Sequence, residues 1–208
     1  MFPNYIQGVL QENNLKTPLY ALCDFETLLK KNISLEEFIL LAKQHNVKLV
    51  QYRDKHNCLD IQKKHLEILT KALNIPIIIN DNIELLDTAH GLHLGQEDIL
   101  RILKEEIKVG NAQLLFKFLR KKYPTKILGI STHNEIEILE ANELGIDYIG
   151  LGAYKATSTK DVSTILGDKI SYLAKISKHP VCAIGGVKKD DVIPNIDFNV
   201  VGSDLYHD

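Results

Sequence analysis

The sequence contains few cysteines, carries almost no net charge and lacks any long hydrophobic run. Its three cysteines, Cys23, Cys58 and Cys182, are odd in number and widely spaced. We therefore expect free thiols in a cytoplasmic protein rather than disulfides or a cysteine metal site. The net charge of −2 gives no sign of nucleic-acid binding. No apolar run approaches the roughly 20 residues of a membrane helix, and the N-terminus lacks the pattern of a signal peptide, so we expect no membrane partner.

The composition is that of an ordinary globular protein. The 208 residues are 45% hydrophobic and 25% charged, which is enough for one sizeable core. No Gly/Ser-rich linker, low-complexity tract or shift of composition divides the chain. We therefore expect a single domain over residues 1–208.

Short apolar runs rich in Val and Ile alternate with longer segments of helical period. Strands are predicted at 19–23, 48–52, 77–79, 91–94, 127–130, 148–151, 181–184 and 198–201. Strands this apolar are typical of parallel sheets that are buried on both faces. Eight of them, separated by helices, favour a closed (β/α)8 TIM barrel of the α/β class over an open doubly wound sheet.

Two parts of the chain depart from a regular barrel. The segment between Asp98 and Ser131 is long for one connection, so we expect two helices there. After the last predicted strand little sequence remains for a full final helix. We expect residues 4–15 to cover part of the resulting gap.

The chemistry of such barrels collects where strands end and the following loops begin. After the second predicted strand come Gln51, Tyr52, Arg53, Asp54 and Lys55. Side chains alternate along an extended segment, so the residues at 51, 53 and 55 share one face. That face carries an amide and two cations, which suits an anion, although a solvated strand end is the alternative interpretation.

Carboxylates and a hydroxyl follow three further strands. Asp81 and Asp98 come after the third and fourth, and each could be a helix N-cap. As neighbours, they could instead share Mg2+ with water and phosphate oxygens. Ser131, after the fifth strand, could donate to a phosphate. His133 could be a base, or a histidine that lines the pocket or lies on the surface.

A second polar cluster follows the sixth predicted strand. It consists of Thr157, Ser158, Thr159 and Lys160, whose hydroxyls and ammonium suit phosphate oxygens, although a solvated turn is the alternative. The loops after the seventh and eighth strands are the usual phosphate site of these barrels, and they hold Gly186, Gly202 and Ser203. The chain thus offers one site for a metal-bound diphosphate and another for a monophosphate.

The ordered series QYRDK, IND, GLHLGQED, LGIST, TSTK, AIGGV and a final GS resembles the thiamine-phosphate synthases. These are (β/α)8 barrels that join a pyrimidine diphosphate to a thiazole phosphate with release of diphosphate, and the resemblance runs from Leu19 to Ser203. It implies that the pyrimidine diphosphate is held by Gln51, Arg53, Lys55, Asn80, Ser131 and Lys160. It also implies a Mg2+ cofactor on Asp81 and Asp98, and a thiazole phosphate held by Thr157, Thr159, Gly186, Gly202 and Ser203.

The reaction implied by the resemblance is dissociative. The departing diphosphate is neutralised by Mg2+ and by the catalytic candidates Arg53, Lys55, Ser131 and Lys160, and the thiazole nitrogen captures the resulting cation. Such a reaction needs electrostatic stabilisation more than a strong base. We include Tyr52, Asp54 and Ser158, which lie within the same motifs, among the substrate-binding candidates.

Some residues depart from the family pattern and leave other functions open. Residues 153–156 lack the usual prolines, His90 replaces an aspartate, and the last strand ends VGSDLY. A related branch tautomerises a thiazole carboxylate phosphate with a histidine at the position of His133, but it usually lacks the lysine and the acidic pair that this chain keeps. A non-catalytic barrel that binds thiazole or thiamine phosphates is the third interpretation. The sequence leaves the oligomeric state undecided, and a homodimer is one possibility.

Overall fold

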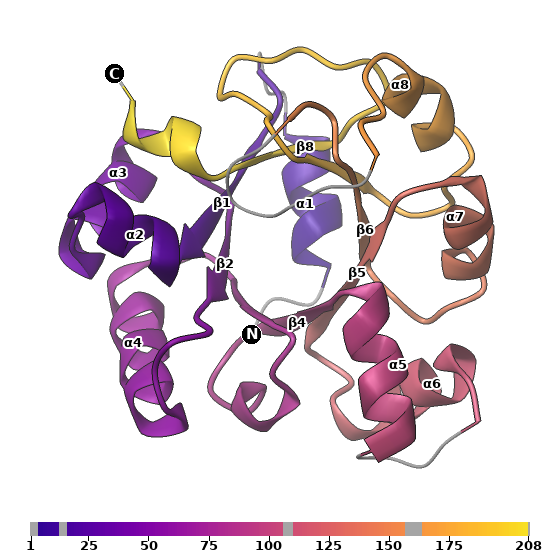
Figure 1. Cartoon of the computed structure of the whole chain (residues 1–208), viewed down its shortest axis with the longest axis horizontal. Helices are drawn as coiled ribbons and strands as arrows, with labels where there is room; N and C mark the ends of the chain where they lie inside the picture. Colours follow the sequence, from indigo (N-terminus) through magenta and orange to yellow (C-terminus); the bar gives the residue numbers. More distant parts are fainter. Residues whose placement is uncertain (1–3, 13–15, 106–109, 157–163, 208) are drawn as a thin grey trace.

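Eight parallel strands form a closed barrel at the centre of the molecule (Figure 1). The computed structural model describes residues 4–12, 16–105, 110–156 and 164–207. The strands are β1 (Leu19–Asp24), β2 (Leu49–Arg53), β3 (Ile77–Asn80), β4 (Gly91–Leu94), β5 (Ile127–Thr132), β6 (Tyr148–Gly152), β7 (Val181–Ile184) and β8 (Phe198–Val201). Each strand pairs with the next along the chain, and β8 closes on β1. The predicted barrel is confirmed, and each predicted strand end lies within two residues of the observed one.

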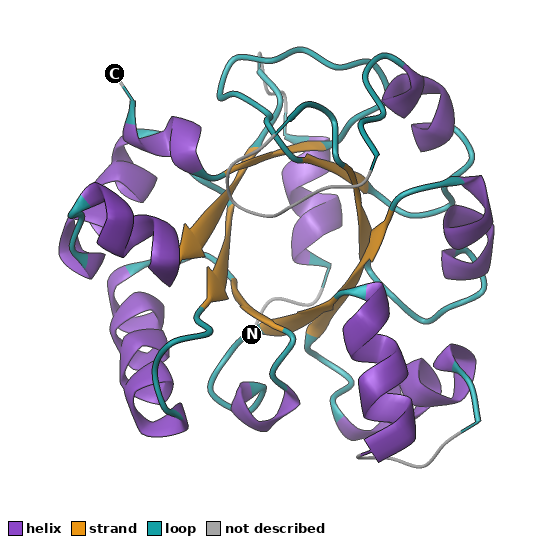
Figure 2. Cartoon of the chain, in the orientation of Figure 1, coloured by secondary structure: helices purple, strands orange, loops and turns teal. Residues whose placement is uncertain are grey.

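Helices surround the barrel on its outside (Figure 2). They are α2 (Phe25–Lys31), α3 (Leu35–Gln44), α4 (Leu59–Ala72), η1 (Ile83–Leu85), α5 (Gln96–Glu105), α6 (Ala112–Lys122), α7 (Glu135–Ala141), α8 (Lys169–Ala174) and η2 (Ser203–Tyr206), where η marks a 3-10 helix. The two helices expected between Asp98 and Ser131 are present as α5 and α6. Among the described residues, no helix combines the length and the apolar character that crossing a membrane requires.

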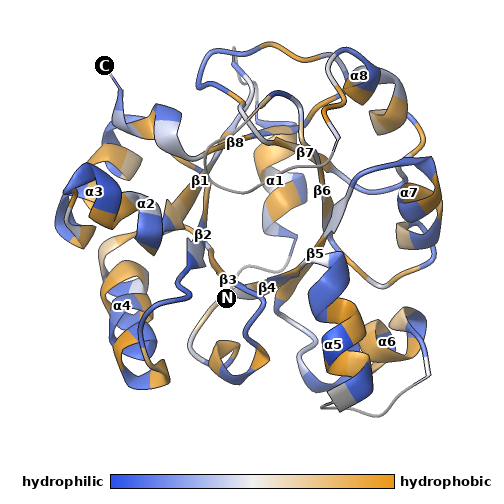
Figure 3. Ribbon diagram, in the orientation of Figure 1, coloured by the Kyte–Doolittle hydropathy of each residue, from blue (hydrophilic) through white to orange (hydrophobic). Residues whose placement is uncertain are grey.

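Apolar side chains form two layers, one on each face of the sheet. Along β1, Ala21 and Cys23 point outward and pack under the helices, whereas Tyr20 belongs to the cluster inside the barrel. This alternation follows from the two-residue period of an extended strand. Figure 3 shows apolar residues on the strands and on the helix faces turned toward them, with polar residues outside. The two layers explain why the strands read as continuous apolar runs.

A short N-terminal helix, α1 (Tyr5–Gln11), closes one end of the barrel rather than covering a gap on its outside. Its buried residues Ile6 and Val9 pack with side chains of the barrel interior, including Leu49 and Ile127. In Figure 1, α1 is seen through the barrel opening. The expectation that residues 4–15 cover part of the gap left by the final helix is therefore wrong for α1, which packs on the barrel interior. The barrel interior presents an apolar surface at this end, and the two buried side chains of α1 pack against it.

The connection from β7 to β8 is fully described and contains turns but no helix. The side chain of Asn199 on β8 reaches this connection, where its Nδ2 donates to the carbonyl of Asp191 at 2.7 Å. After β8 the chain continues directly into η2, whose Leu205 is buried. The barrel is therefore covered on this side by a loop held through an amide and by a single short helical turn.

Candidate active site

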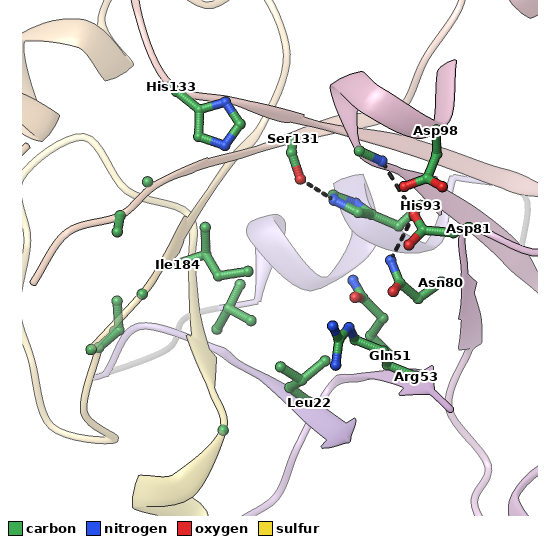
Figure 4. A pocket seen from close by; sticks show the side chains of 18 of the residues that line it. Leu22, Gln51, Arg53, Asn80, Asp81, His93, Asp98, Ser131, His133 and Ile184 are labelled. Carbon is green, nitrogen blue, oxygen red and sulfur yellow. Dashed lines mark hydrogen bonds between the residues drawn. The ribbon is translucent and has the colours of Figure 1, made fainter. Parts of the chain in front are cut away.

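One pocket opens at the carboxyl ends of the strands (Figure 4), where the sequence predicts the chemistry to lie. Its volume is about 320 Å³, which is the size of a small-molecule site. The pocket is lined by apolar side chains of Leu22, Ile184 and Val200 and by polar side chains of Gln51 and His93. These five come from strands on different sides of the barrel. The lining therefore suits a flat ring that carries polar substituents.

Two cations stand on one wall of the pocket. Arg53 ends β2, and Lys55 follows two residues later, so both side chains face the pocket together with Gln51, as the alternation predicts. The guanidinium of Arg53 forms an ion pair with Asp24, whose carboxylate is almost fully buried at the end of β1. This pair restricts the direction of the guanidinium, whereas Lys55 is mostly exposed and has more freedom. This wall thus carries the guanidinium of Arg53, held by its ion pair, and the more exposed ammonium of Lys55.

Tyr52 and Asp54 do not line the main pocket, and their side chains are fully buried, although Asp54 belongs to the lining of a second hollow beside it. Tyr52 is completely buried, and its hydroxyl donates to Asp54 Oδ2 at 2.7 Å and lies 2.7 Å from His65 Nδ1 on α4. The Asp54 carboxylate also accepts from the backbone of His56 and Asn57. Although burial opposes its charge, these hydrogen bonds lower the pKa of Asp54. This carboxylate anchors the loop that carries Lys55.

Asp54→Ala should therefore destabilise the protein without touching the pocket directly. The side chain is fully buried and accepts several hydrogen bonds, so its loss leaves buried donors without a partner. We expect the free energy of unfolding in urea to fall by about 2–3 kcal/mol. Asp60→Ala is the matched control, because Asp60 is an exposed residue of the first turn of α4, and it should cost at most about 1 kcal/mol. Equal losses in both variants would contradict the anchoring role.

Two carboxylates lie beside the cations in the pocket. Asp81 follows β3 in a left-handed backbone conformation with φ of 61°, and Asp98 lies in the first turn of α5. Lys55 Nζ lies 3.9 Å from Asp81 Oδ2, and Asn80 Nδ2 donates to Asp81 Oδ1 at 3.1 Å. The helix-cap alternative is wrong for both residues, because η1 is capped by Asn82 and Asp98 lies inside its helix. Helix capping therefore does not explain why the two carboxylates lie close together.

The carboxylates of Asp81 and Asp98 repel each other, and this repulsion affects the pKa of Asp81. Burial, followed by the charge of the neighbouring Asp98, raises the pKa of Asp81 to about 6. A divalent cation between the carboxylates would remove this repulsion. Two carboxylates fit Mg2+ better than Zn2+, because Mg2+ keeps several waters and takes further oxygens from substrate phosphates. Within the described residues, no group of three or more His, Cys, Asp and Glu residues is placed to hold a metal.

Asp98 also borders a second, more polar hollow on the same side. Its cationic side chains are Arg53, Lys55 and Arg101, and Arg101 lies one turn after Asp98 on α5. The sequence offered no prediction for Arg101, although its spacing of three residues from Asp98 places both on one helix face. The pocket therefore continues into a region of mixed charge, in which these three cations lie among the acidic residues Asp54, Asp81, Glu84 and Asp98.

A buried histidine, His93 on β4, is a polar group of the pocket that the sequence analysis did not single out. Its Nε2 lies 2.9 Å from the Oγ of Ser131, and its Nδ1 lies 3.0 Å from the Tyr148 hydroxyl (Figure 4 shows the contact with Ser131). The Ser131 hydroxyl faces the pocket as predicted. Its strand end is held further by Gln96 Nε2, which donates to the Ser131 carbonyl at 2.6 Å.

Glycines form the opposite wall. Gly185 and Gly186 follow β7 with φ of 86° and 64°, which is left-handed backbone that side chains rarely adopt. A Cβ at Gly186 would lie 2.6 Å from the carbonyl oxygen of Ala156, so the loops after β6 and β7 touch at this point. Gly202 and Ser203 after β8 complete the wall. The predicted residues of the monophosphate site that are described thus lie together.

The remaining predicted residues, Thr157, Ser158, Thr159 and Lys160, lie outside the described residues. Ala156, which precedes them, lines the pocket. His133 also borders the pocket, but its side chain is 46% exposed and its Nδ1 lies 2.9 Å from Glu137 Oε2 on α7. Its place at the rim suits a lining residue.

Comparison with known proteins identifies relatives of the whole barrel. The model of the family described as thiamine monophosphate synthase matches residues 19–203. A thiamine-phosphate synthase from Clostridium acetobutylicum is 34% identical over 197 residues, which cover 91% of this chain and 85% of the relative. Another, from Lawsonia intracellularis, is 32% identical over 198 residues, covering 88% and 81%.

Solved structures share the architecture at lower identity. A thiamine phosphate pyrophosphorylase from Pyrococcus furiosus superposes with a TM-score of 0.68 at 24% identity, covering 90% of this chain and 86% of that one. A geranylgeranylglyceryl phosphate synthase from Thermoplasma acidophilum reaches 0.63 at 11% identity, covering 100% and 93%. At these identities the likeness supports the barrel fold alone.

Proposed function

Because the chain belongs to the thiamine monophosphate synthase family, we propose that its pocket joins a pyrimidine diphosphate to a thiazole phosphate and releases diphosphate. The chain is accordingly a transferase of thiamine biosynthesis. The two substrates and the use of Mg2+ are part of the proposal. Its main structural support is the opposition of Lys55 to Asp81 at 3.9 Å, with Arg53 and Asp98 beside them. A diphosphate needs such a mixed site, in which cations bind its oxygens and carboxylates hold a metal.

The proposed mechanism assigns each wall of the pocket one task. The pyrimidine ring lies on Leu22, Ile184 and Val200, which exclude water from it. Arg53 and Lys55 bind the diphosphate oxygens and stabilise the negative charge that grows as the C–O bond breaks. Mg2+, held by the acidic pair when bound, supplies further positive charge to the leaving group.

The thiazole substrate is proposed to enter from the glycine wall. In this proposal its phosphate binds to the backbone amides at Gly186 and Gly202 and to the Ser203 hydroxyl, because these residues line the pocket. The ring nitrogen then faces the methylene carbon of the pyrimidine, and its lone pair forms the new C–N bond. This nitrogen carries no proton, so the step requires no protein base and depends on positioning.

The deciding experiment combines purified protein with the pyrimidine diphosphate, the thiazole phosphate and Mg2+. Thiamine phosphate and diphosphate should form in equal amounts, measured by chromatography. Reactions that lack one substrate are the controls. Tight binding of the substrates without any product would instead favour the non-catalytic barrel.

His133→Asn tests the tautomerase alternative. In a synthase this exposed side chain only lines the pocket, so we expect thiamine phosphate formation to stay within about tenfold of the wild-type rate, or about 1.4 kcal/mol. In a tautomerase it would move a proton, and its loss would cost about 100- to 10,000-fold. Glu135→Gln is the matched control on the exposed start of α7. Metal-free isomerisation of a thiazole carboxylate phosphate that disappears in His133→Asn would overturn the assignment.

A further inference from the structure

A line of hydrogen bonds crosses the interior of the barrel and joins two walls of the pocket. Gln51 Nε2 donates to the Tyr20 hydroxyl at 3.0 Å, and this hydroxyl lies 2.8 Å from that of Tyr148. The Tyr148 hydroxyl lies 3.0 Å from His93 Nδ1, and His93 Nε2 lies 2.9 Å from Ser131 Oγ. The four residues before Ser131 are buried, with exposed fractions of at most 4%. We call Gln51, Tyr20, Tyr148, His93 and Ser131 the barrel relay.

A glycine in the sheet, Gly129, leaves the space that the rings of His93 and Tyr148 need. Gly129 on β5 pairs with His93 on β4 and with Tyr148 on β6, so it separates these two residues at one level of the barrel. A Cβ at this position would lie 2.2 Å from the Tyr148 ring. Without it, the rings of His93 and Tyr148 stack with centroids 5.5 Å apart across the intervening strand. The relay thus depends on the absence of a side chain between its two aromatic members.

The direction of the hydrogen bonds follows if each buried hydroxyl proton has an acceptor. The Tyr20 oxygen accepts from Gln51, and its other partner among the described residues is the Tyr148 hydroxyl, so the single Tyr20 proton has an acceptor only when it points to Tyr148. The Tyr148 proton then goes to His93 Nδ1. A neutral imidazole that accepts at Nδ1 carries its proton on Nε2, and this proton goes to Ser131. The Ser131 hydroxyl then accepts from His93, and its own proton can be donated to a ligand in the pocket.

We propose that the barrel relay fixes the polarity of two groups at the bottom of the pocket. At one end it orients the Gln51 amide: Nε2 donates to Tyr20, so Oε1 is the atom that can accept a hydrogen bond from the ligand. At the other end it makes the Ser131 hydroxyl a donor, through His93 held as the neutral Nε2–H tautomer. The pocket then selects a ligand with a donor group near Gln51 and an anionic oxygen near Ser131. The ligand identity rests on the proposed function, whereas the tautomer does not.

His93, Tyr148 and Tyr20 are positioning residues in this proposal. Breaking the relay at two places should give different results. Tyr148→Phe removes the donor to His93 Nδ1, so it frees the tautomer and the Ser131 end. Tyr20→Phe frees the Gln51 end but leaves the Tyr148 proton on His93. A matched control is Tyr123→Phe, because Tyr123 is a buried tyrosine after α6 that packs in the outer layer.

The test is 15N NMR of histidine-labelled, ligand-free protein at pH 7.5, with His93 assigned through His93→Asn. We expect a single Nε2–H tautomer for His93 in the wild type, in Tyr20→Phe and in Tyr123→Phe, and a mixture of tautomers in Tyr148→Phe. An Nδ1–H tautomer or a charged ring in the wild type would overturn the proposal, as would an unchanged tautomer in Tyr148→Phe. The wild-type spectrum decides the polarity even if a variant fails to fold.

Kinetics test the consequence for the ligand. Tyr148→Phe should lower kcat/KM for the pyrimidine diphosphate about tenfold and leave the KM of the thiazole phosphate unchanged, since the relay does not reach the glycine wall. A tenfold loss for both substrates would indicate general distortion and contradict the positioning role. If the Nε2–H tautomer is found but no thiamine phosphate forms, the proposed function fails while the relay stands.

Discussion

Removing divalent cations with EDTA should abolish thiamine phosphate formation, and excess Mg2+ should restore it. We expect this because Asp81 and Asp98 line the cavity beside Lys55 and Arg53, and the cations alone cannot neutralise a diphosphate beside these carboxylates. Asp81→Asn should raise the Mg2+ concentration needed for half-maximal rate by at least tenfold. Asp87→Asn, in the exposed loop after η1, is the control. Full activity in EDTA would contradict the metal site.

The pH dependence adds a second measurement of the same site. Because the pKa of Asp81 is raised to about 6, its protonation should weaken Mg2+ binding as the pH falls through that value. In metal-free protein the sign is opposite: the protonated form of Asp81 is favoured by folding, and this stability is lost as the pH rises through about 6. Asp81→Asn should therefore raise Tm at pH 7.5 without metal but leave it unchanged at pH 4. A lower Tm at pH 7.5 would contradict this account.

Lys160→Ala should lower kcat by about 100- to 1000-fold, the effect of losing one preorganised electrostatic donor of about 2.7–4 kcal/mol. The prediction rests on the sequence, since Lys160 lies outside the described residues. In the sequence Lys160 follows three consecutive hydroxyl residues, and Ala156 immediately before them lines the pocket. If Lys160 meets the diphosphate as charge builds, kcat should fall while the KM of the thiazole phosphate changes little.

Lys155 provides the matched control for Lys160 in the same loop. Its ammonium lies 3.2 Å from the Asp191 carboxylate and 4.5 Å from the centroid of the Tyr154 ring, so it is directed away from the pocket. Lys155→Ala should leave kcat within about twofold of the wild-type value. If Lys160→Ala behaved in the same way, Lys160 would be a solvated loop residue and the diphosphate would depend on Arg53 and Lys55.

The positions of the strands and of most pocket residues were predictable because they depend on local periods. The two-residue period of β2 turns Gln51, Arg53 and Lys55 to the pocket. The same rule turns the Tyr52 side chain to the outside of the barrel, where its hydroxyl contacts Asp54 and His65 on α4. The regular spacing of apolar runs likewise predicted the closed barrel.

The relay and the place of α1 could not be read from local patterns. His93 and Tyr148 are 55 residues apart and meet only because Gly129 separates them in the register of three strands. A sequence shows each of them as an ordinary strand residue. The two buried residues of α1 indicate an amphipathic helix, but not which apolar surface it covers. Such long-range contacts follow from the closure of the barrel.

Helix α1 covers the end of the barrel opposite the pocket, where Ile6 and Val9 pack in the same inner cluster as Tyr20 and Tyr148. Both tyrosines are buried, and their hydroxyls lie 2.8 Å apart. A ring bound on the pocket floor would therefore restrict the access of solvent to these hydroxyls from the pocket side. Solvent exchange of these two hydroxyl protons should then slow when the pyrimidine diphosphate binds, which makes the interior of the barrel a reporter of occupancy.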